Sequence, residues 1–266
     1  MTTKKSVLII TGYGLNCEAE STFAWEQAGT APRRVHLNDL LENPAQLHDF
    51  GALMFIGGFS YGDHMGSGLV FAHRLRHHLR DQLQKFIGDG KLILAVCNGF
   101  QIVTKLGLLP GLDGDYFTQT VSLMQNDCGH FQNFWVKLKF EKESPCVFTR
   151  GIDFMPLPAR HGEGKIFTTD KTLLEKIETQ KLAACRYCHP ATGEATMEFP
   201  HNPNGSLNAI AGLCDPTGRI FGLMPHPEAY LFPENHPQWD LQKIRGELPE
   251  RGLGLKIFQN AVEYLR

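Results

Sequence analysis

Short apolar runs alternate with amphipathic stretches from the start of the chain to about residue 110. The runs are brief and almost unbroken, as is typical of strands buried on both faces of a sheet. Between them, 18–28 has helical composition and 69–87 places apolar residues at helical spacing. This alternation predicts βαβ units, in which helices cover a parallel sheet. The predicted strands are 7–10, 35–37, 52–56 and 91–96.

The pattern changes beyond Gly111, where strand-like runs are joined by turns. These runs predict antiparallel strands that are added to the sheet, after which the chain returns to the main sheet. An amphipathic helix is predicted at 255–265. We predict one domain over 1–266, with a proline-rich loop insertion at about 230–252. The strand-like runs are 121–125, 134–140, 182–185, 207–213 and 220–224.

Composition excludes several classes of protein. With 26 basic and 28 acidic side chains the formal net charge is -2, and no charged block suggests binding to nucleic acid or anionic membrane. No apolar run approaches the roughly 18 residues of a membrane span. Residues 1–5 lead into an apolar run too short for a signal peptide. Seven cysteines, an odd number spread thinly, favour reduced thiols in the cytoplasm over a disulfide framework.

Cys97 lies at the junction of a predicted strand and a predicted helix, with Gly99 two residues later. This is the layout of a nucleophile elbow, which exposes the side chain at the carboxyl edge of an α/β sheet. The positive end of the helix would favour the thiolate. A free cysteine is also commonly a buried structural residue. Position alone does not decide between these two interpretations.

A thiolate nucleophile needs a base and a group that orients the base. His226 and Glu228 follow the last apolar run, each preceded by a proline. In an extended chain, residues two apart project to the same side, so these side chains are expected to form a hydrogen bond. Together with Cys97 they predict a Cys-His-Glu triad.

Two glycines follow the predicted strand at 52–56. Glycine lets the backbone approach a ligand closely, so the amides of Gly58 and Asn98 are candidates for an oxyanion hole. The alternative is a tight turn without a catalytic role.

Other motifs favour structural interpretations. Residues 185–189 match the C-x-x-C-H pattern of haem attachment, but no export signal accompanies it. Cys17 also follows a strand, yet it lacks the glycine two residues later, so we interpret it as structural or incidental. His73 and His77 have the spacing of a metal pair without a further ligand nearby. Residues 12–14 lack the third glycine of a dinucleotide fingerprint. We therefore predict no metal, nicotinamide or flavin.

Taken together, the motifs resemble the glutaminase subunits of phosphoribosylformylglycinamidine synthase, a family of class I (triad-type) glutamine amidotransferases of purine biosynthesis. The matching segments follow the family order over nearly the whole chain. Gly-Gly-Phe-Ser-Tyr-Gly-Asp at 57–63 combined with Asn-Gly-Phe-Gln at 98–101 is the narrowest match. The other segments are 125–127, 161–164, 205–206, 210–212, 224–228 and 254–259.

The resemblance implies a flavodoxin-like, doubly wound α/β fold, with a mostly parallel sheet, helices on both faces and antiparallel additions. It implies that Cys97 is the nucleophile, that His226 is the general base and acid, and that Glu228 orients His226. The Gly58 and Asn98 amides would form the oxyanion hole.

The resemblance further implies that Gln101, Gln125 and Asn126 contact the substrate glutamine. The roles of His161 and Glu163 stay open.

In this family L-glutamine is hydrolysed through a thioester and ammonia passes to a synthetase subunit. That partner would bind ATP and Mg²⁺ and convert formylglycinamide ribonucleotide to formylglycinamidine ribonucleotide. This chain would bind no cofactor or metal, and a third small subunit is left open.

Three alternatives remain. The first is an amidotransferase that serves another acceptor, as in GMP or CTP synthesis. The second is a non-catalytic protein on the same fold. The third is a cysteine peptidase or a thiol-stress protein.

Overall fold

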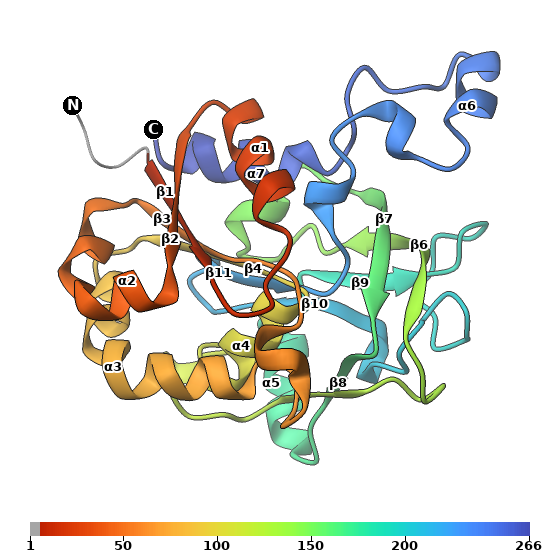
Figure 1. Cartoon of the computed structure of the whole chain (residues 1–266). Coiled ribbons are helices and arrows are strands. Elements are labelled where there is room, and N and C mark those ends of the chain that lie inside the picture. Colours follow the sequence, from red (N-terminus) through yellow and green to blue (C-terminus); the bar gives the residue numbers. More distant parts are fainter. Residues whose placement is uncertain (1–5) are drawn as a thin grey trace.

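A central β-sheet organises the computed structural model, which describes residues 6–266 (Figure 1). Residues 1–5, on which the expected absence of a signal peptide depends, lie outside the described range. The strands are β1 (Ser6–Thr11), β2 (Ala31–His36), β3 (Ala52–Phe55), β4 (Leu92–Val96), β5 (Ser122–Gln125), β6 (Gln132–Phe140), β7 (Phe154–His161), β8 (Glu163–Phe167), β9 (Cys185–Cys188), β10 (Ile210–Cys214) and β11 (Ile220–Leu223). The helices are α1 (Glu18–Gln27), α2 (Leu37–Glu42), α3 (Leu69–Gly88), α4 (Asn98–Leu106), α5 (Lys171–Thr179), α6 (Trp239–Arg245) and α7 (Leu255–Tyr264).

Nine strands form one mixed sheet in the order β2-β1-β3-β4-β11-β10-β9-β6-β7, and β5 pairs with β8 in a second, two-stranded sheet. From β2 to β11 the neighbouring strands run parallel. From β11 to β7 they run antiparallel. Helices α1 and α7 cover one face of the parallel part, and α3 and α4 cover the other (Figure 1). The predicted α/β fold with antiparallel additions is therefore confirmed.

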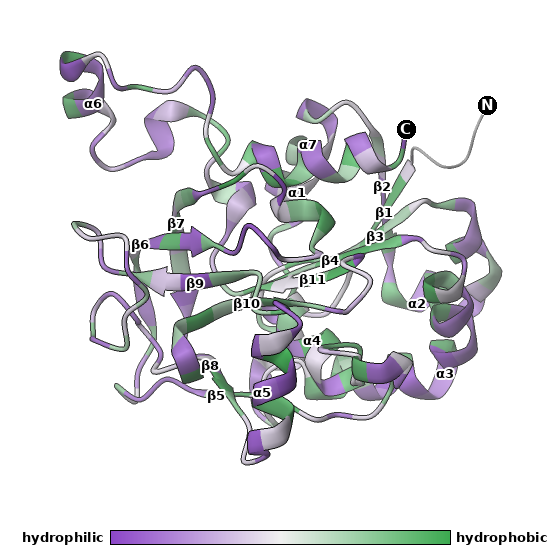
Figure 2. Ribbon diagram, turned by 180° about the vertical axis from the view of Figure 1, so that it is seen from behind, coloured by the Kyte–Doolittle hydropathy of each residue, from purple (hydrophilic) through white to green (hydrophobic). Residues whose placement is uncertain are grey.

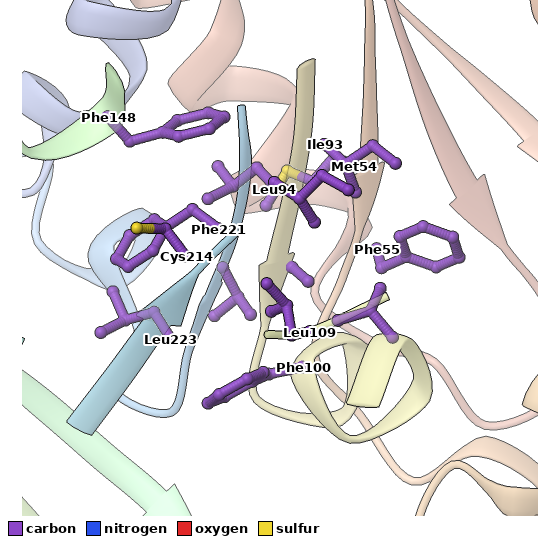
Figure 3. Packing of buried hydrophobic residues seen from close by; sticks show 14 of the residues in the cluster. Met54, Phe55, Ile93, Leu94, Phe100, Leu109, Phe148, Cys214, Phe221 and Leu223 are labelled. Atoms are coloured by element: carbon purple, nitrogen blue, oxygen red, sulfur yellow. The ribbon is translucent and has the colours of Figure 1, made fainter. Parts of the chain in front are cut away.

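Buried apolar side chains pack around β4 and β11 (Figure 3). Every residue of β3, β4 and β11 is buried, as expected for strands covered on both faces. The rings of Phe148 and Phe221 stack with centroids 5.8 Å apart. A Cβ at Gly222 would lie 2.1 Å from the ring of Phe100, so the missing side chain lets α4 pack directly against the sheet. Colouring by hydropathy shows the same arrangement, with apolar strands inside and polar outer helix faces (Figure 2).

Several elements differ from the predicted ones. The proline-containing strand β7 was not predicted; it lies at the sheet edge, where a missing backbone donor is tolerated. Helix α5 was also missed, although the side chain of Asp170 caps it by accepting a hydrogen bond from the amide of Leu173 at 3.0 Å. Strand β9 begins at Cys185, the last residue of the predicted run. Residues 182–184 form a buried loop in front of it. Residues 207–209 form a 3₁₀ turn before β10.

The segment at 230–252 carries helix α6 between its loops and projects from the body of the molecule (Figure 1). None of the residues of α6 is buried. Across residues 6–266, no helix is both long enough and apolar enough to cross a membrane.

Candidate active site

Cys97 joins β4 to α4 in a backbone conformation that non-glycine residues rarely adopt, with φ 52° and ψ -110°. The helix begins at the next residue, so the thiol lies at its positive end. A Cβ at Gly99 would lie 2.1 Å from the carbonyl oxygen of Phe55. Glycine two residues after Cys97 is therefore required for α4 to cross the end of β3 closely. This is the physical reason for the glycine in the elbow pattern.

His226 and Glu228 form a buried pair at the end of β11, with side chains 5% and 1% exposed. Nδ1 of His226 donates a hydrogen bond to Oε1 of Glu228 over 2.6 Å. Nε2 of His226 has no hydrogen-bond partner among the described residues. Burial alone would lower the pKa of His226, but the Glu228 carboxylate and the Cys97 thiol raise that pKa well above its usual value. The pair therefore holds an imidazole that is readily protonated.

The two halves of the site meet at Gly57. A Cβ placed on Gly57 would lie 2.9 Å from Cε1 of His226, 3.0 Å from Sγ of Cys17 and 3.5 Å from Cβ of Cys97. The imidazole therefore lies beside both thiols. A cavity of about 260 Å³ opens above them. Its lining residues are Asn16, Cys17, Glu20, Gly58, Phe59, Cys97, Phe131, Arg160 and His226.

Cys17 is the residue of this site that the sequence interpretation set aside as structural or incidental. It precedes α1 at the end of the loop that follows β1, and β1 lies beside β3 in the parallel sheet. The signal that could have placed Cys17 in the site was its position after the first strand, because the carboxyl ends of neighbouring parallel strands meet at one edge of a sheet.

We expect the two thiols to differ in reactivity. Burial raises the pKa of the Cys17 thiol, so Cys17 stays protonated at neutral pH. Cys97 lies at the N-terminus of α4 and beside His226, a base that can take the proton of its thiol. Iodoacetamide should therefore modify Cys97 at least about tenfold faster than Cys17, as measured by peptide mapping over time. Preferential modification of Cys17 would contradict this assignment, and Cys97→Ala gives the rate of Cys17 alone.

Two backbone amides are available beside Cys97. The bridge between Leu15 and Gly58 is closed by hydrogen bonds of their neighbours, from Asn16 N–H to Gly57 O at 3.2 Å and from Phe59 N–H to Gly14 O at 2.8 Å. The amide of Gly58 takes no part in that pairing. The amide of Asn98 is the first of α4, where N–H groups have no partner within the helix.

The side chain of Asn98 fastens the glycine-rich loop to the elbow. Its Oδ1 accepts a hydrogen bond from the amide of Ser60 at 3.2 Å, and its Nδ2 donates to Oδ1 of Asp63 at 3.3 Å. This explains why segments 57–63 and 98–101 occur together as a motif: each positions the backbone of the other.

Gln101, a predicted contact of glutamine, is buried and both ends of its amide are occupied. Its Nε2 donates to the carbonyl oxygen of Glu163 at 2.5 Å, and its Oε1 accepts from Nδ2 of Asn98 at 2.8 Å. The carboxylate of Glu163 accepts a hydrogen bond from the amide of Ser67 at 3.3 Å. Gln101 and Glu163 thus join α4 to β8 and to the loop before α3, outside the lining of the cavity.

Asn126 and Gln125, the other predicted contacts, also lie outside the lining. Asn126 is buried; its Oδ1 lies 3.2 Å from Nδ1 of His161 and its Nδ2 donates to the carbonyl oxygen of His161 at 2.8 Å. Burial and the positive charge of His226 lower the pKa of His161 to about 3, so His161 is neutral. Gln125 is exposed and lines a separate hollow with Lys165. Direct contact of these residues with glutamine stays a prediction.

One group of potential metal ligands converges within residues 6–266, namely Cys17, His226 and Glu228, whose ligand atoms lie within 4.8 Å of one another. The hydrogen bond from Nδ1 to Glu228 already uses one nitrogen of His226 and one carboxylate oxygen. A metal held by those two atoms would break the bond that orients the imidazole. The arrangement fits acid–base chemistry better. The thiols of Cys185 and Cys188, from the haem-like motif, are buried in β9.

Comparison with known proteins identifies the family of the chain. Residues 4–265 match the model of the CobB/CobQ-like glutamine amidotransferase domain. The PurQ subunit of phosphoribosylformylglycinamidine synthase from Methanococcus maripaludis is 43% identical over 97% of this chain and 96% of its own length. The PurQ subunit from Dehalococcoides mccartyi is 40% identical over 99% of this chain and 98% of its own length.

A solved structure of PurLQS from Thermotoga maritima contains a chain that is 28% identical, with a TM-score of 0.68 over 98% of this chain and 99% of that one. Both the sequence relatives and this structural neighbour match the chain over nearly its whole length. The chain therefore belongs to the CobB/CobQ-like glutamine amidotransferase family and, within it, to the PurQ subunits of phosphoribosylformylglycinamidine synthase.

Proposed function

We propose that the chain hydrolyses L-glutamine at Cys97 and delivers the ammonia to a synthetase subunit. That subunit would use ATP to convert formylglycinamide ribonucleotide to formylglycinamidine ribonucleotide. The observation that carries the proposal is the convergence of Cys97 with the His226–Glu228 pair beneath one cavity of about 260 Å³. Membership in the PurQ family supports the choice of acceptor.

The reaction has two halves. The Cys97 thiolate attacks the side-chain amide carbon of glutamine, and the Gly58 and Asn98 amides donate hydrogen bonds to the resulting oxyanion. His226, protonated next to Glu228, gives a proton to the departing ammonia as the thioester forms. His226 then takes a proton from water, which attacks the thioester and releases glutamate. Cys97 leaves the hydrolysed thioester as a thiolate beside the reprotonated His226, which restores the starting state, so each cycle consumes one glutamine and one water.

The ammonia must reach the acceptor before bulk water protonates it, which requires a docked partner. We propose a PurL-type synthetase and a PurS-type small subunit, supported by the PurLQS structure of Thermotoga maritima. ATP and Mg²⁺ would bind to the synthetase. No residue of this chain is assigned a role in holding either.

The proposal is tested by measuring glutamate release with and without the synthetase subunits, ATP and formylglycinamide ribonucleotide. Release should rise when all of them are present. Release that ignores the acceptor would contradict the assigned pathway while leaving the triad intact. No release from the full mixture would contradict the glutaminase function.

The oxyanion hole predicts the effect of Gly58→Ala. A Cβ at this position would lie 2.6 Å from Cα of Leu15 and 2.7 Å from the carbonyl oxygen of Gly14, and the glycine has φ +141°. The loop must shift and carry the amide donor away from Cys97, so kcat should fall about 10²- to 10³-fold. Gly88→Ala in α3 is the matched control, because nothing lies within 4 Å of its added Cβ. Normal kcat in Gly58→Ala would remove this amide from the oxyanion hole.

A further inference from the structure

Two residues with side chains of opposite charge line the active-site cavity and have no part in the triad. Glu20 comes from the first turn of α1, and Arg160 comes from the end of β7. Glu20 is half-buried and Arg160 is exposed. Within residues 6–266, neither side chain forms an ion pair or a hydrogen bond. Both are therefore available to a ligand.

Arg160 is fixed beside the nucleophile by its backbone. The thiol of Cys97 donates a weak hydrogen bond to the carbonyl oxygen of Arg160 over 3.6 Å. Strand β7 is paired with β6 along its length, so this attachment point is set by the sheet. A guanidinium presents a planar set of N–H donors that matches both oxygens of a carboxylate. Because the Arg160 backbone lies next to Cys97, the distance from the Arg160 guanidinium to Cys97 is limited by the length of the arginine side chain.

The remaining rim suits an aliphatic segment. Phe59 and Phe131 both line the cavity, and their ring centroids lie 6.1 Å apart. The cavity, at about 260 Å³, is smaller than the roughly 300–1,000 Å³ typical of sites for drug-sized ligands. It therefore suits a small metabolite with a short apolar stem.

We propose that Arg160 binds the α-carboxylate and Glu20 the α-ammonium of a free L-amino acid whose side-chain amide lies at Cys97. This inference rests on the proposed glutaminase function and specifies its substrate class. Free glutamine carries both charged groups, separated from its amide by a short methylene stem. A glutamine residue inside a peptide carries neither group, so the mouth of the site rejects peptide amides. Gln101, Gln125 and Asn126, the predicted contacts of glutamine, lie outside the lining.

The test compares two electrophiles that modify Cys97 in the full chain assembled with its synthetase partner. Diazo-oxo-norleucine has the shape of glutamine and carries both α-groups, whereas iodoacetamide is neutral and has neither. Arg160→Leu and Glu20→Gln should each slow labelling by diazo-oxo-norleucine about 10- to 100-fold, the expected loss for a charge-assisted hydrogen bond. Labelling by iodoacetamide should stay within about twofold. In turnover, KM for glutamine should rise more than kcat falls, and Arg160→Lys should recover part of the loss.

Matched controls remove the same charges elsewhere on the surface. Glu26→Gln lies on the same helix as Glu20, and Arg33→Leu lies on β2; both positions are exposed. These variants should label like the native chain. Unchanged diazo-oxo-norleucine rates in the mouth variants would overturn the proposal. An equal fall in the rates of labelling by diazo-oxo-norleucine and by iodoacetamide would also overturn it, because the substitutions would then have changed the reactivity of Cys97 itself. If the native complex reacts with iodoacetamide but never with diazo-oxo-norleucine, the glutaminase function itself fails, and the subsite with it.

Discussion

Replacing Cys97 with alanine should lower glutamine-dependent glutamate release about 10⁵- to 10⁶-fold, to the background level. The reason is that the thiolate forms the covalent bond on which both halves of the reaction depend, and removal of a nucleophile from a triad typically costs this much. The fold should survive, because the hydrogen bond of the thiol to the carbonyl oxygen of Arg160, at 3.6 Å, is weak. The measurement is glutamate release in the presence of the synthetase subunits, ATP and acceptor.

The matched control for this variant is Cys128→Ala, which removes a free, half-buried thiol that is not part of the cavity lining. It should leave glutamate release within about twofold of the native rate. Cys97→Ala should also abolish labelling by diazo-oxo-norleucine. Undiminished release after Cys97→Ala would refute the mechanism proposed for this site, whatever the acceptor.

Glu228→Gln should lower kcat about 10³- to 10⁴-fold, as loss of the orienting carboxylate does in related triads. Burial lowers the pKa of His226, and the Glu228 carboxylate is the main group that opposes this effect. Without that charge the pKa of His226 falls, so the imidazole is neutral at neutral pH and cannot protonate the departing ammonia. An NMR titration of His226 should show protonation moving to lower pH, and the kcat profile should move with it.

The same pair predicts a pH-dependent difference in stability. A histidine whose pKa is raised on folding stabilises the native state fully below about pH 6.5 and loses that contribution as the pH rises through its folded pKa. The free energy of unfolding lost in Glu228→Gln should therefore be greatest near pH 6 and shrink at alkaline pH. Glu234→Gln, an exposed change in the same segment, is the control and should show no such trend. An unshifted His226 titration in Glu228→Gln would contradict both expectations.

The parallel part of the fold could be predicted because its signals are local. The strands from 52 and 91 are unbroken apolar runs, and the helix over 69–88 repeats its buried positions every three or four residues. The edge strand β7 and helix α5 were missed for different reasons. The prolines of β7 argue against a strand unless its place at the edge is known. In α5 only Leu173 and Ile177 are buried, which leaves a weak periodic signal.

The candidate triad was predictable because its members lie at recognisable junctions. An apolar strand followed by Cys97 and Gly99 specifies the elbow, since only glycine allows the close crossing over Phe55. The spacing of His226 and Glu228 allows a hydrogen bond within one short segment. These relations involve neighbours in the chain, and local geometry limits where their side chains can point.

The placement of Cys17, Glu20 and Arg160 was decided only by the tertiary structure. These residues line one cavity with Cys97 because β1, β3, β4 and β7 end around it, although they are distant in sequence. No local pattern marks such residues, since the approach of β7 depends on how the whole antiparallel half folds back. The sequence by itself determined the family and marked Cys97 as the candidate nucleophile, through short-range constraints. The surroundings of Cys97, including the charged residues that line the cavity, depend on long-range packing, because strands distant in sequence end at one edge of the sheet.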